Sequence, residues 1–357
     1  MAISGQHGGN VLQMAAQFHV DPQMVLDFSA NINPMGLPDS LQTAIIEHLT
    51  DAEQYPDIEY TELHQAIASH IGCDANFVLA GNGATELIFL WVHYFRPRRA
   101  MIIEPTFAEY RRALERYECD IESYPLLEQD NYQLTEAFLN SLNAGLDCLF
   151  LCTPNNPTGL MPEPALLEKI IIKCQALNIA LFVDESFIDF LPHATNCSSL
   201  LSQYSHLYVL RSLTKFYAMP GLRLGYLLSS DISLLNKIRD QREPWTINTF
   251  AALSADIVLN DDDYNQATYT WLAQEQRYLF DALNQFPSLS VLKPSANYIF
   301  FTVAGDIDLQ SKLMGHQILI RSCANYPQLN QQHYRIAIKS HQDNMRLIEA
   351  LNEVFND

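Results

Sequence analysis

Short apolar runs alternate with longer amphipathic stretches from about Leu63 to Leu210. The stretch 164–178 has apolar residues at helical spacing, whereas the short runs have the composition of buried strands. Strands that alternate with helices predict an α/β fold, with a mostly parallel sheet covered by helices on both faces. Ligands of such sheets gather at the carboxyl ends of the strands. The expected strands are 77–81, 100–105, 148–154, 180–186 and 207–212.

The pattern changes after Trp245. A helical region over about 247–286 is followed by a terminal helix from about Ser340, with the strand-like runs LSVLKP, YIFFTV, ILIRS and YRIAIK between them. This order predicts a smaller α+β domain beside the α/β domain. We expect three parts, which are an N-terminal arm with a small-domain segment over 1–40, a large domain over 41–245 and a small C-terminal domain over 246–357.

Charge excludes some classes of function. The chain has 41 acidic and 21 basic side chains, giving a formal net charge of −20, and the acidic residues are spread along the sequence. Such a chain repels a polyanion on average, so we expect no nucleic-acid partner. No apolar stretch approaches the roughly 20 residues needed to span a bilayer, so we expect no membrane partner. Sites that bind anions must then be small clusters of Arg and Lys.

The seven cysteines show no C-x-x-C pair, and no histidine stands at metal-ligand spacing. Cys148 and Cys152 flank a strand-like run, where buried and reduced thiols are the usual state. We therefore expect no metal site. The N-terminus, MAISGQHGGN, lacks the charged and apolar regions of a signal peptide, so we expect a cytoplasmic protein.

A glycine turn in AGNGATEL follows the first expected strand. The amides of Gly83, Ala84 and Thr85 open a helix there, and exposed amides at a helix start favour an anion. Taken alone, the motif fits a simple strand–helix turn better than a binding site.

The segment CTPNNPTG follows a later, strongly apolar strand. It carries Asn155, Asn156 and Thr158 between two prolines, at the carboxyl end of that strand. Asn and Pro favour turns, so a plain turn is one interpretation. Two adjacent asparagines bracketed by prolines are nevertheless more constrained than a turn requires.

Asp184 and Glu185 end the strand-like run LFVDE. A carboxylate deep at the end of a buried strand is costly unless it meets a cation. A pyridinium nitrogen is one such cation, because a carboxylate keeps that ring protonated and electron-withdrawing.

Lys215 and Arg223 lie in the otherwise apolar stretch RSLTKFYAMPGLRLGY. Alone, Lys215 could be a lysine at the rim of a loop. Together with the glycine turn and Asp184, the two residues supply what is needed to hold pyridoxal 5′-phosphate, an anionic aromatic aldehyde. Lys215 would form the Schiff base, and Arg223 with Ser212 and Thr214 would bind the phosphate. We expect burial and nearby cations to lower the pKa of Lys215.

With these motifs in order on successive strand ends, the sequence resembles the fold-type I pyridoxal-phosphate enzymes, in the branch that contains the histidinol-phosphate aminotransferases. The resemblance covers nearly the whole chain. It implies that Tyr110 in EPTFAEY stacks on the cofactor ring and that Asn156 binds its 3′ oxygen. It also implies a homodimer with shared active sites, in which Tyr55 in QYPD reaches the cofactor phosphate of the neighbouring subunit. Arg335 in YRIAI would bind the substrate carboxylate.

Within that branch, HGGN, DFSANINPMG, RSLTKFYAMPGLRLGYL and ILIRSCANYPQL resemble segments of the L-threonine O-3-phosphate decarboxylases of cobalamin biosynthesis. The aminotransferases usually have Tyr where this chain has Phe187, which favours the decarboxylases. The resemblance implies decarboxylation of L-threonine O-3-phosphate to (R)-1-amino-2-propanol O-2-phosphate. HGGN by itself would fit a flexible tail. The residues implied to contact the substrate are His7, Gly8, Asn31, Asn156, Arg321 and Arg335.

Other functions stay open at this point. A histidinol-phosphate-type aminotransferase also needs Lys215 and a phosphate-binding arginine. A cofactor-binding regulator without catalysis is disfavoured by the intact set of Lys215, Asp184 and Arg223. We expect Arg321 to bind mainly the substrate phosphate and Arg335 mainly the carboxylate, although two arginines near two anions also fit the reverse assignment.

Overall fold

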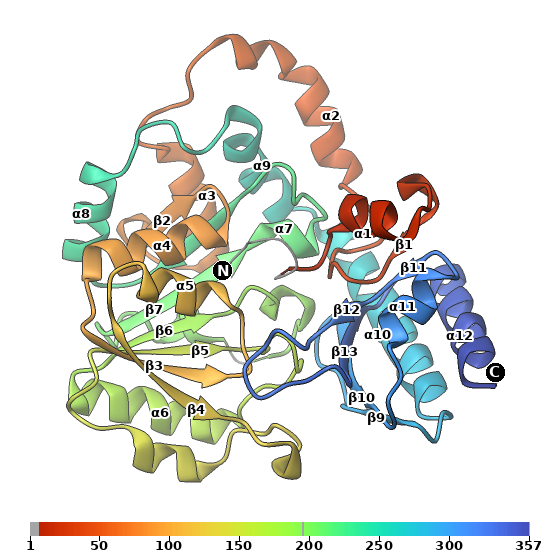
Figure 1. The fold of residues 1–357 in the computed structure, drawn as a ribbon. Helices are drawn as coiled ribbons and strands as arrows, with labels where there is room; N and C mark the ends of the chain where they lie inside the picture. Colours follow the sequence, from red (N-terminus) through yellow and green to blue (C-terminus); the bar gives the residue numbers. More distant parts are fainter. Residues whose placement is uncertain (1–6, 195, 357) are drawn as a thin grey trace.

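The computed structural model describes residues 7–194 and 196–356, so the first six residues of the expected N-terminal arm lie outside it. A seven-stranded sheet dominates the structure (Figure 1). Its neighbouring strands are parallel except at β8, which is antiparallel to both of its neighbours. In spatial order the strands are β2 (Val78–Gly81), β8 (Gly225–Leu228), β7 (Leu207–Ser212), β6 (Ala180–Asp184), β5 (Cys148–Cys152), β3 (Arg99–Glu104) and β4 (Asp120–Pro125).

Helices cover both faces of this sheet, as the alternating pattern predicts. On β5, Leu149 and Leu151 join one core cluster, while Phe150 between them joins the other. The central strands are therefore apolar along most of their length, because each face is buried. The first face packs against α6 (Pro164–Leu177), α3 (Thr61–Ile71) and α9 (Thr249–Leu259), and the second against α4 (Ala84–Phe95), α5 (Glu109–Glu115) and α8 (Ile232–Gln241).

The parallel arrangement brings the ends of separate strands to one edge. Strands β2, β5, β6 and β7 run in the same direction, so their carboxyl ends lie together. Gly81, Cys152, Asp184 and Ser212 are the last residues of those strands. The short helix α7 (Leu213–Phe216) follows β7 directly and carries Lys215 to the same edge.

Two smaller sheets lie beside the large one (Figure 1). An antiparallel sheet has the order β12 (Arg321–Ser322), β13 (His333–Ala337), β10 (Tyr298–Val303) and β9 (Leu289–Val291). A parallel pair joins β1 (Leu26–Asp27) to β11 (Ile318–Leu319). The remaining helices are α1 (Val11–Phe18), α2 (Asp39–Glu47), α10 (Asp262–Leu283), α11 (Leu309–Met314) and α12 (His341–Asn356). The expected domain boundaries at residues 40 and 245 stay a prediction.

Several elements differ from the sequence prediction. The expected single strand ILIRS is divided at Ile320, so that β11 pairs with β1 while β12 pairs with β13. The expected helical region over 247–286 consists of two helices, α9 and α10, and Asp261 between them caps α10 by accepting a hydrogen bond from the Tyr264 amide at 3.0 Å. Strands β4 and β8 were not expected.

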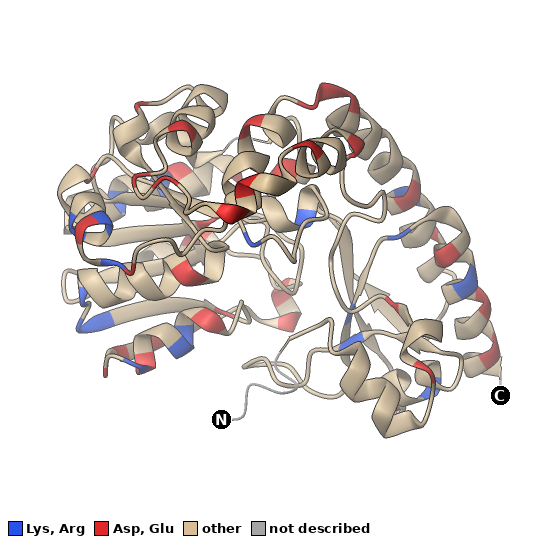
Figure 2. Cartoon of the chain, turned by 90° about the horizontal axis from the view of Figure 1, so that it is seen from above, with Lys and Arg blue, Asp and Glu red and all other residues tan. Residues whose placement is uncertain are grey.

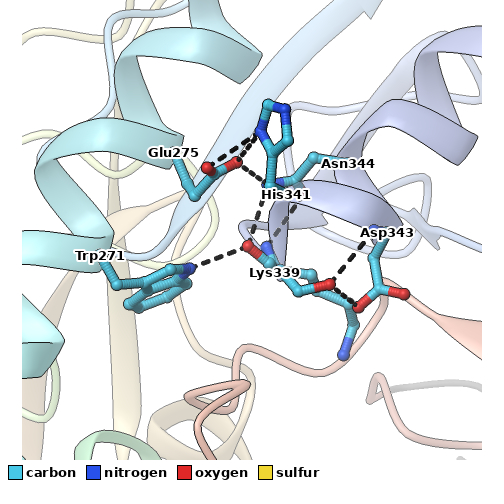
Figure 3. A network of polar contacts seen from close by, with 7 residues as sticks. Trp271, Glu275, Lys339, His341, Asp343 and Asn344 are labelled. Carbon is cyan, nitrogen blue, oxygen red and sulfur yellow. Dashed lines mark hydrogen bonds and ion pairs between the residues drawn. The ribbon is translucent and has the colours of Figure 1, made fainter.

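A polar network around the buried side chains of Glu275 and Asn344 holds the chain just after β13 (Figure 3). Trp271 Nε1 on α10 and Asn344 Nδ2 on α12 both donate to the Lys339 carbonyl, at 2.9 Å each. Glu275 accepts from Asn344 at 2.9 Å and contacts His341 Nδ1 at 3.1 Å. Both helices therefore fix the end of the strand that carries Arg335.

Asp and Glu are spread over the helices rather than gathered in one patch (Figure 2). None of the described helices is long and apolar enough to cross a membrane. Among the described residues, no group of three or more His, Cys, Asp or Glu side chains could hold a metal ion. All seven cysteines are free, and all but Cys73 are buried.

Candidate active site

A cavity of about 140 Å³ lies beside Lys215. Six of the residues predicted to bind cofactor or substrate line this cavity: His7, Gly8, Asn31, Asn156, Lys215 and Arg335. Ser29, Phe107, Phe187 and Tyr326 also line it. Residues from the N-terminus, from the large sheet and from the small sheet therefore meet at one cavity.

Lys215 is half-buried and points its amine at other predicted groups. Its Nζ donates to Ser212 Oγ at 3.1 Å and lies 5.1 Å from the centre of the Phe187 ring. Burial lowers the pKa of Lys215, the charge of Arg223 lowers it further, and Asp184 opposes both effects. At neutral pH, the uncharged fraction of the Lys215 amine is therefore larger than that of an exposed lysine. A lysine acts as a nucleophile only in its uncharged form.

The amides predicted to bind an anion lie where α4 begins, and we call the site formed by Gly83, Ala84 and Thr85 the anion cradle. Gly83 caps the helix with a φ of 79°, and the amides of Ala84 and Thr85 open it. A Cβ atom on Gly83 would lie 2.4 Å from Arg223 Nη2, so the guanidinium rests directly against the glycine. On the Lys215 side, the hydroxyls of Ser212 and Thr214 are 2.9 Å apart. The structure thus brings the predicted phosphate-binding residues together, apart from Tyr55.

Asp184 is the buried carboxylate at the end of β6, with 4% of its surface exposed. Its Oδ1 accepts from the Ser186 amide at 2.9 Å and its Oδ2 from the Tyr110 hydroxyl at 2.6 Å. The neighbouring Glu185 turns away and forms an ion pair with Arg211 Nε at 2.9 Å. Only Asp184 of the two carboxylates is therefore in a position to serve a cofactor ring.

Tyr110 lies beside Asp184, to which its hydroxyl donates a hydrogen bond at 2.6 Å. Its ring is buried and stacks on Phe150, with ring centres 5.2 Å apart. Phe107, the other aromatic ring of EPTFAEY, lines the cavity. The stacking of Tyr110 on the cofactor ring stays a prediction.

The two adjacent asparagines have different surroundings. Asn155 ties the loops together, because its Nδ2 donates to the Pro105 carbonyl at 2.9 Å and to Thr158 Oγ1 at 3.0 Å. Asn156 lines the cavity, and its Oδ1 accepts from Arg335 Nη1 and from the Tyr326 hydroxyl. Asn155 thus holds the rigid loop that presents Asn156.

Arg335 and Arg321 are both buried, with 5% of each residue exposed. Arg335 donates from Nη2 to the Ser29 carbonyl at 2.8 Å. Arg321 donates to Asn325 Oδ1 at 2.8 Å and lies over the Tyr326 ring, 5.7 Å from its centre. Arg321 does not line the cavity directly, but Tyr326 connects it to the wall that Asn156 and Arg335 form.

Asn31 is 6% exposed and lines the cavity. Neither its side-chain oxygen nor its nitrogen has a hydrogen-bond partner in the part of the chain that the structure describes. A buried amide without partners is costly, so a polar ligand in the cavity is its natural partner.

The N-terminal residues are held against the loop after β1. Gly8 packs so closely that a Cβ atom would lie 2.0 Å from the Ser29 carbonyl oxygen. The Gly9 amide donates to Ser29 Oγ at 2.7 Å. HGGN therefore belongs to the site in this structure. Gly8 is required for the close approach, and Gly9 has a φ of 81°, which favours glycine.

Tyr55 does not join the other residues. It is 81% exposed and packs against Trp245, with ring centres 4.7 Å apart. Such an exposed aromatic pair suits a contact with another molecule, but its role stays a prediction.

The arrangement fits pyridoxal 5′-phosphate. The charges of Asp184 and of Arg223, which rests on the anion cradle at Gly83, both act on Lys215. Lys215 and Asn31 line the same cavity, and Asn31, whose polar atoms have no partner among the described residues, can bind a ligand there. Fold and site together define an enzyme of the aminotransferase type. The chain belongs to the aminotransferase class I and II family, whose sequence model matches residues 23–351.

Similar proteins indicate which enzymes of this family the chain resembles. The threonine-phosphate decarboxylase of Salmonella typhimurium is 50% identical over 353 residues, which cover 99% of this chain and 97% of the relative. The histidinol-phosphate aminotransferase structure from Clostridium acetobutylicum is 29% identical, with a TM-score of 0.88 over 93% of this chain and 99% of that one. The L-threonine-O-3-phosphate decarboxylase structure from Porphyromonas gingivalis, 22% identical, shares the fold, with a TM-score of 0.82 over 92% and 99% of the two chains.

Proposed function

We propose that this chain is a pyridoxal-phosphate-dependent threonine-phosphate decarboxylase of cobalamin biosynthesis. It converts L-threonine O-3-phosphate to (R)-1-amino-2-propanol O-2-phosphate and carbon dioxide. The observation that carries the proposal is the 50% identity to the Salmonella typhimurium threonine-phosphate decarboxylase over nearly the full length of both chains. The fold and the residues around Lys215 support it.

The cofactor would be held at three points. Lys215 binds its aldehyde, Asp184 pairs with its ring nitrogen, and the start of α4 with Arg223 binds its phosphate. When bound, pyridoxal phosphate supplies an electron sink that accepts the electrons of whichever Cα bond lies perpendicular to its ring. The protein selects the reaction by fixing the rotation of the substrate about that carbon.

Arg321 and Arg335 fix this rotation by binding the two ends of the substrate. A substrate that carries both a phosphate and a carboxylate can be bound at each end, and two buried guanidiniums match two anions. Arg335 lines the cavity and binds mainly the carboxylate, while Arg321 binds mainly the phosphate. His7 and Asn31 contact the substrate from the N-terminal side. Held in this way, the Cα–carboxylate bond is the one that breaks.

Phe187 distinguishes this site from an aminotransferase site. Its ring lies 5.1 Å from Lys215 Nζ and has no hydroxyl to offer to the cofactor. The second candidate function is a histidinol-phosphate-type aminotransferase, which the close fold of the Clostridium acetobutylicum enzyme favours. The two functions share Lys215 and differ in the substrate that the cavity accepts.

We also propose a homodimer in which Tyr55 completes the active site of the partner subunit. The exposure of the Tyr55–Trp245 pair supports this arrangement. An aromatic pair of this size is favoured at protein interfaces.

A substrate comparison tests the proposed function. The purified protein is loaded with pyridoxal phosphate and given either L-threonine O-3-phosphate or histidinol phosphate with a 2-oxo acid acceptor. We expect turnover of the first and release of 1-amino-2-propanol O-2-phosphate, identified by mass spectrometry. Turnover of histidinol phosphate alone would overturn the proposal in favour of the aminotransferase.

A further inference from the structure

A buried glutamate outside the predicted site contacts one of the predicted substrate residues. Glu109 is the first residue of α5 and is 3% exposed. Its Oε1 lies 2.7 Å from His7 Nε2. Arg112, one turn later, donates from Nη1 to Oε1 at 2.7 Å and to Oε2 at 2.6 Å. The His7 ring also packs on Phe107, with ring centres 5.7 Å apart.

This contact and a second one at Ser29 hold the segment 7–10, which we call the strap. Ser29 Oγ accepts a hydrogen bond from the Gly9 amide, and the Ser29 carbonyl leaves no room for a side chain on Gly8. Glu109 belongs to a helix on the large sheet, whereas Ser29 follows β1 of the small parallel pair. In Figure 1, the red segment before α1 runs from the smaller sheets toward the larger one. The strap therefore bridges the two sides of the cavity that it lines.

The charge of Glu109 gives the strap its preferred position. Burial raises the pKa of Glu109, but the hydrogen bonds from His7 and Arg112 outweigh burial and lower the pKa overall. The carboxylate is therefore ionised at neutral pH. If the strap moved away from α5, the buried carboxylate of Glu109 would lose His7 and keep only Arg112. The position in which His7 contacts Glu109 is therefore favoured. The contact also commits His7 Nε2 to the protein, and Nδ1 is the ring nitrogen with which His7 would bind a ligand.

We propose that Glu109 is a positioning residue for the substrate site, which anchors the strap and sets His7 toward the anionic groups of the substrate. The inference rests on the proposed function for its substrate, and it assigns Glu109 no contact with the reacting atoms. Glu109 acts through His7, so its effect must appear in substrate binding and must depend on His7.

The same region offers a matched control. Glu104, at the end of β3, is 4% exposed and pairs with Arg111, the neighbour of Arg112, at 3.1 Å from Nε and 3.0 Å from Nη2. It is thus an equally buried glutamate–arginine pair, and it does not line the cavity. Removing Glu104 tests the effect of losing a buried ion pair here without removing the anchor of the strap.

The experiment is a double-mutant cycle on the holoenzyme with L-threonine O-3-phosphate. We expect Glu109→Ala and His7→Ala each to raise KM about tenfold or more, with a much smaller change in kcat. The double variant should match the single ones. Glu109→Gln should recover part of the affinity, because its carbonyl can accept the same hydrogen bond but carries no charge. The effects of Glu104→Ala and His7→Ala should be additive. Additive effects of Glu109→Ala and His7→Ala would overturn the proposal.

Amide hydrogen exchange tests the strap without any reaction, and so separates this inference from the proposed function. We expect faster exchange of the Gly9 amide in Glu109→Ala and in His7→Ala, but not in Glu104→Ala. His7→Ala changes a half-exposed side chain, so it remains informative if Glu109→Ala does not fold. Unchanged Gly9 exchange in His7→Ala would show that the Glu109 contact does not anchor the strap.

Discussion

Arg321 and Arg335 lie directly opposite each other on the antiparallel strands β12 and β13. Residues paired in this way project from the same face of a sheet, and like charges directly opposite are destabilising. Both side chains are buried, so solvent screens their repulsion weakly. An anion bound between or beside the two guanidiniums relieves this repulsion. The register of two short strands thus favours a doubly anionic substrate.

Removing either arginine should weaken the reaction strongly. Truncating one partner of a buried charge pair costs about 2–5 kcal/mol, so we expect kcat/KM for L-threonine O-3-phosphate to fall roughly 30-fold or more in Arg321→Ala and in Arg335→Ala. Arg321→Ala should also loosen the rotation of the substrate and allow a small transamination side reaction.

The product separates the roles of the two arginines, because it retains the phosphate and has lost the carboxylate. We expect Arg321→Ala to weaken inhibition by 1-amino-2-propanol O-2-phosphate, and Arg335→Ala to leave it nearly unchanged. The opposite pattern would reverse the assignment of phosphate and carboxylate.

The general position of the site could be predicted from the sequence, because parallel strands place their carboxyl ends at one edge. Asp184, Ser212 and Lys215 follow buried runs, and this position alone brings them together. The orientation of side chains could not be predicted. Tyr110 and Phe107 are three residues apart in one motif, and the packing of α5 on the sheet decides which ring faces the cavity.

Long-range pairing explains the other differences. β8 is short and follows a loop, and its antiparallel place between β2 and β7 depends on β2, which lies far away in the chain. The run ILIRS at 318–322 changes sheets at Ile320, although its sequence predicts a single strand. The role of Glu109 could not be predicted from the sequence, because a glutamate at the start of a helix is common and its partner His7 is 102 residues away.

Gly83 should be essential for the phosphate cradle. Its φ of 79° disfavours other residues, and a Cβ atom would displace Arg223. Charge-assisted bonds contribute about 1.5–3 kcal/mol each, so we expect Gly83→Ala and Arg223→Ala to weaken cofactor binding about 10- to 100-fold in a spectrophotometric titration. Gly305→Ala is the control, since Gly305 also has a positive φ but no atom within 4 Å of its Cβ position. Unaltered affinity in Arg223→Ala would place the phosphate elsewhere.

Shared active sites predict complementation between inactive chains. Lys215→Ala should lack both turnover and the visible absorbance of the lysine-bound cofactor, and Tyr55→Ala should be strongly impaired. In a mixture of the two variants, hybrid dimers contain one site with both Lys215 and Tyr55. We expect partial recovery of activity, measured after demonstrated exchange of subunits. No recovery under those conditions counts against the role of Tyr55.

His64 should make the stability of the protein sensitive to acid. Burial, together with the charges of Arg239 and Arg242, lowers the pKa of His64 to about 4, and its Nε2 accepts the Ala80 amide on β2 at 3.2 Å. The unfolded chain binds a proton near pH 6.5, so the free energy of unfolding falls as the pH decreases from about 6.5 to about 4. The loss is on the order of 3 kcal/mol.

The matched variant for this effect is His64→Gln, which keeps an acceptor for the Ala80 amide and cannot be protonated. Denaturant unfolding of both proteins across this pH range checks the prediction. The stability difference between them should shift in favour of the variant as the pH falls. A pH-independent difference would show that His64 is not the responsible group.

The most direct test of the proposed function is the product ratio from L-threonine O-3-phosphate. The holoenzyme is incubated with this substrate while carbon dioxide and keto acid are measured in the same samples, with Lys215→Ala as the blank. The proposed mechanism predicts one carbon dioxide for each substrate consumed, no keto acid and no turnover in the blank. Keto acid as the main product would contradict it.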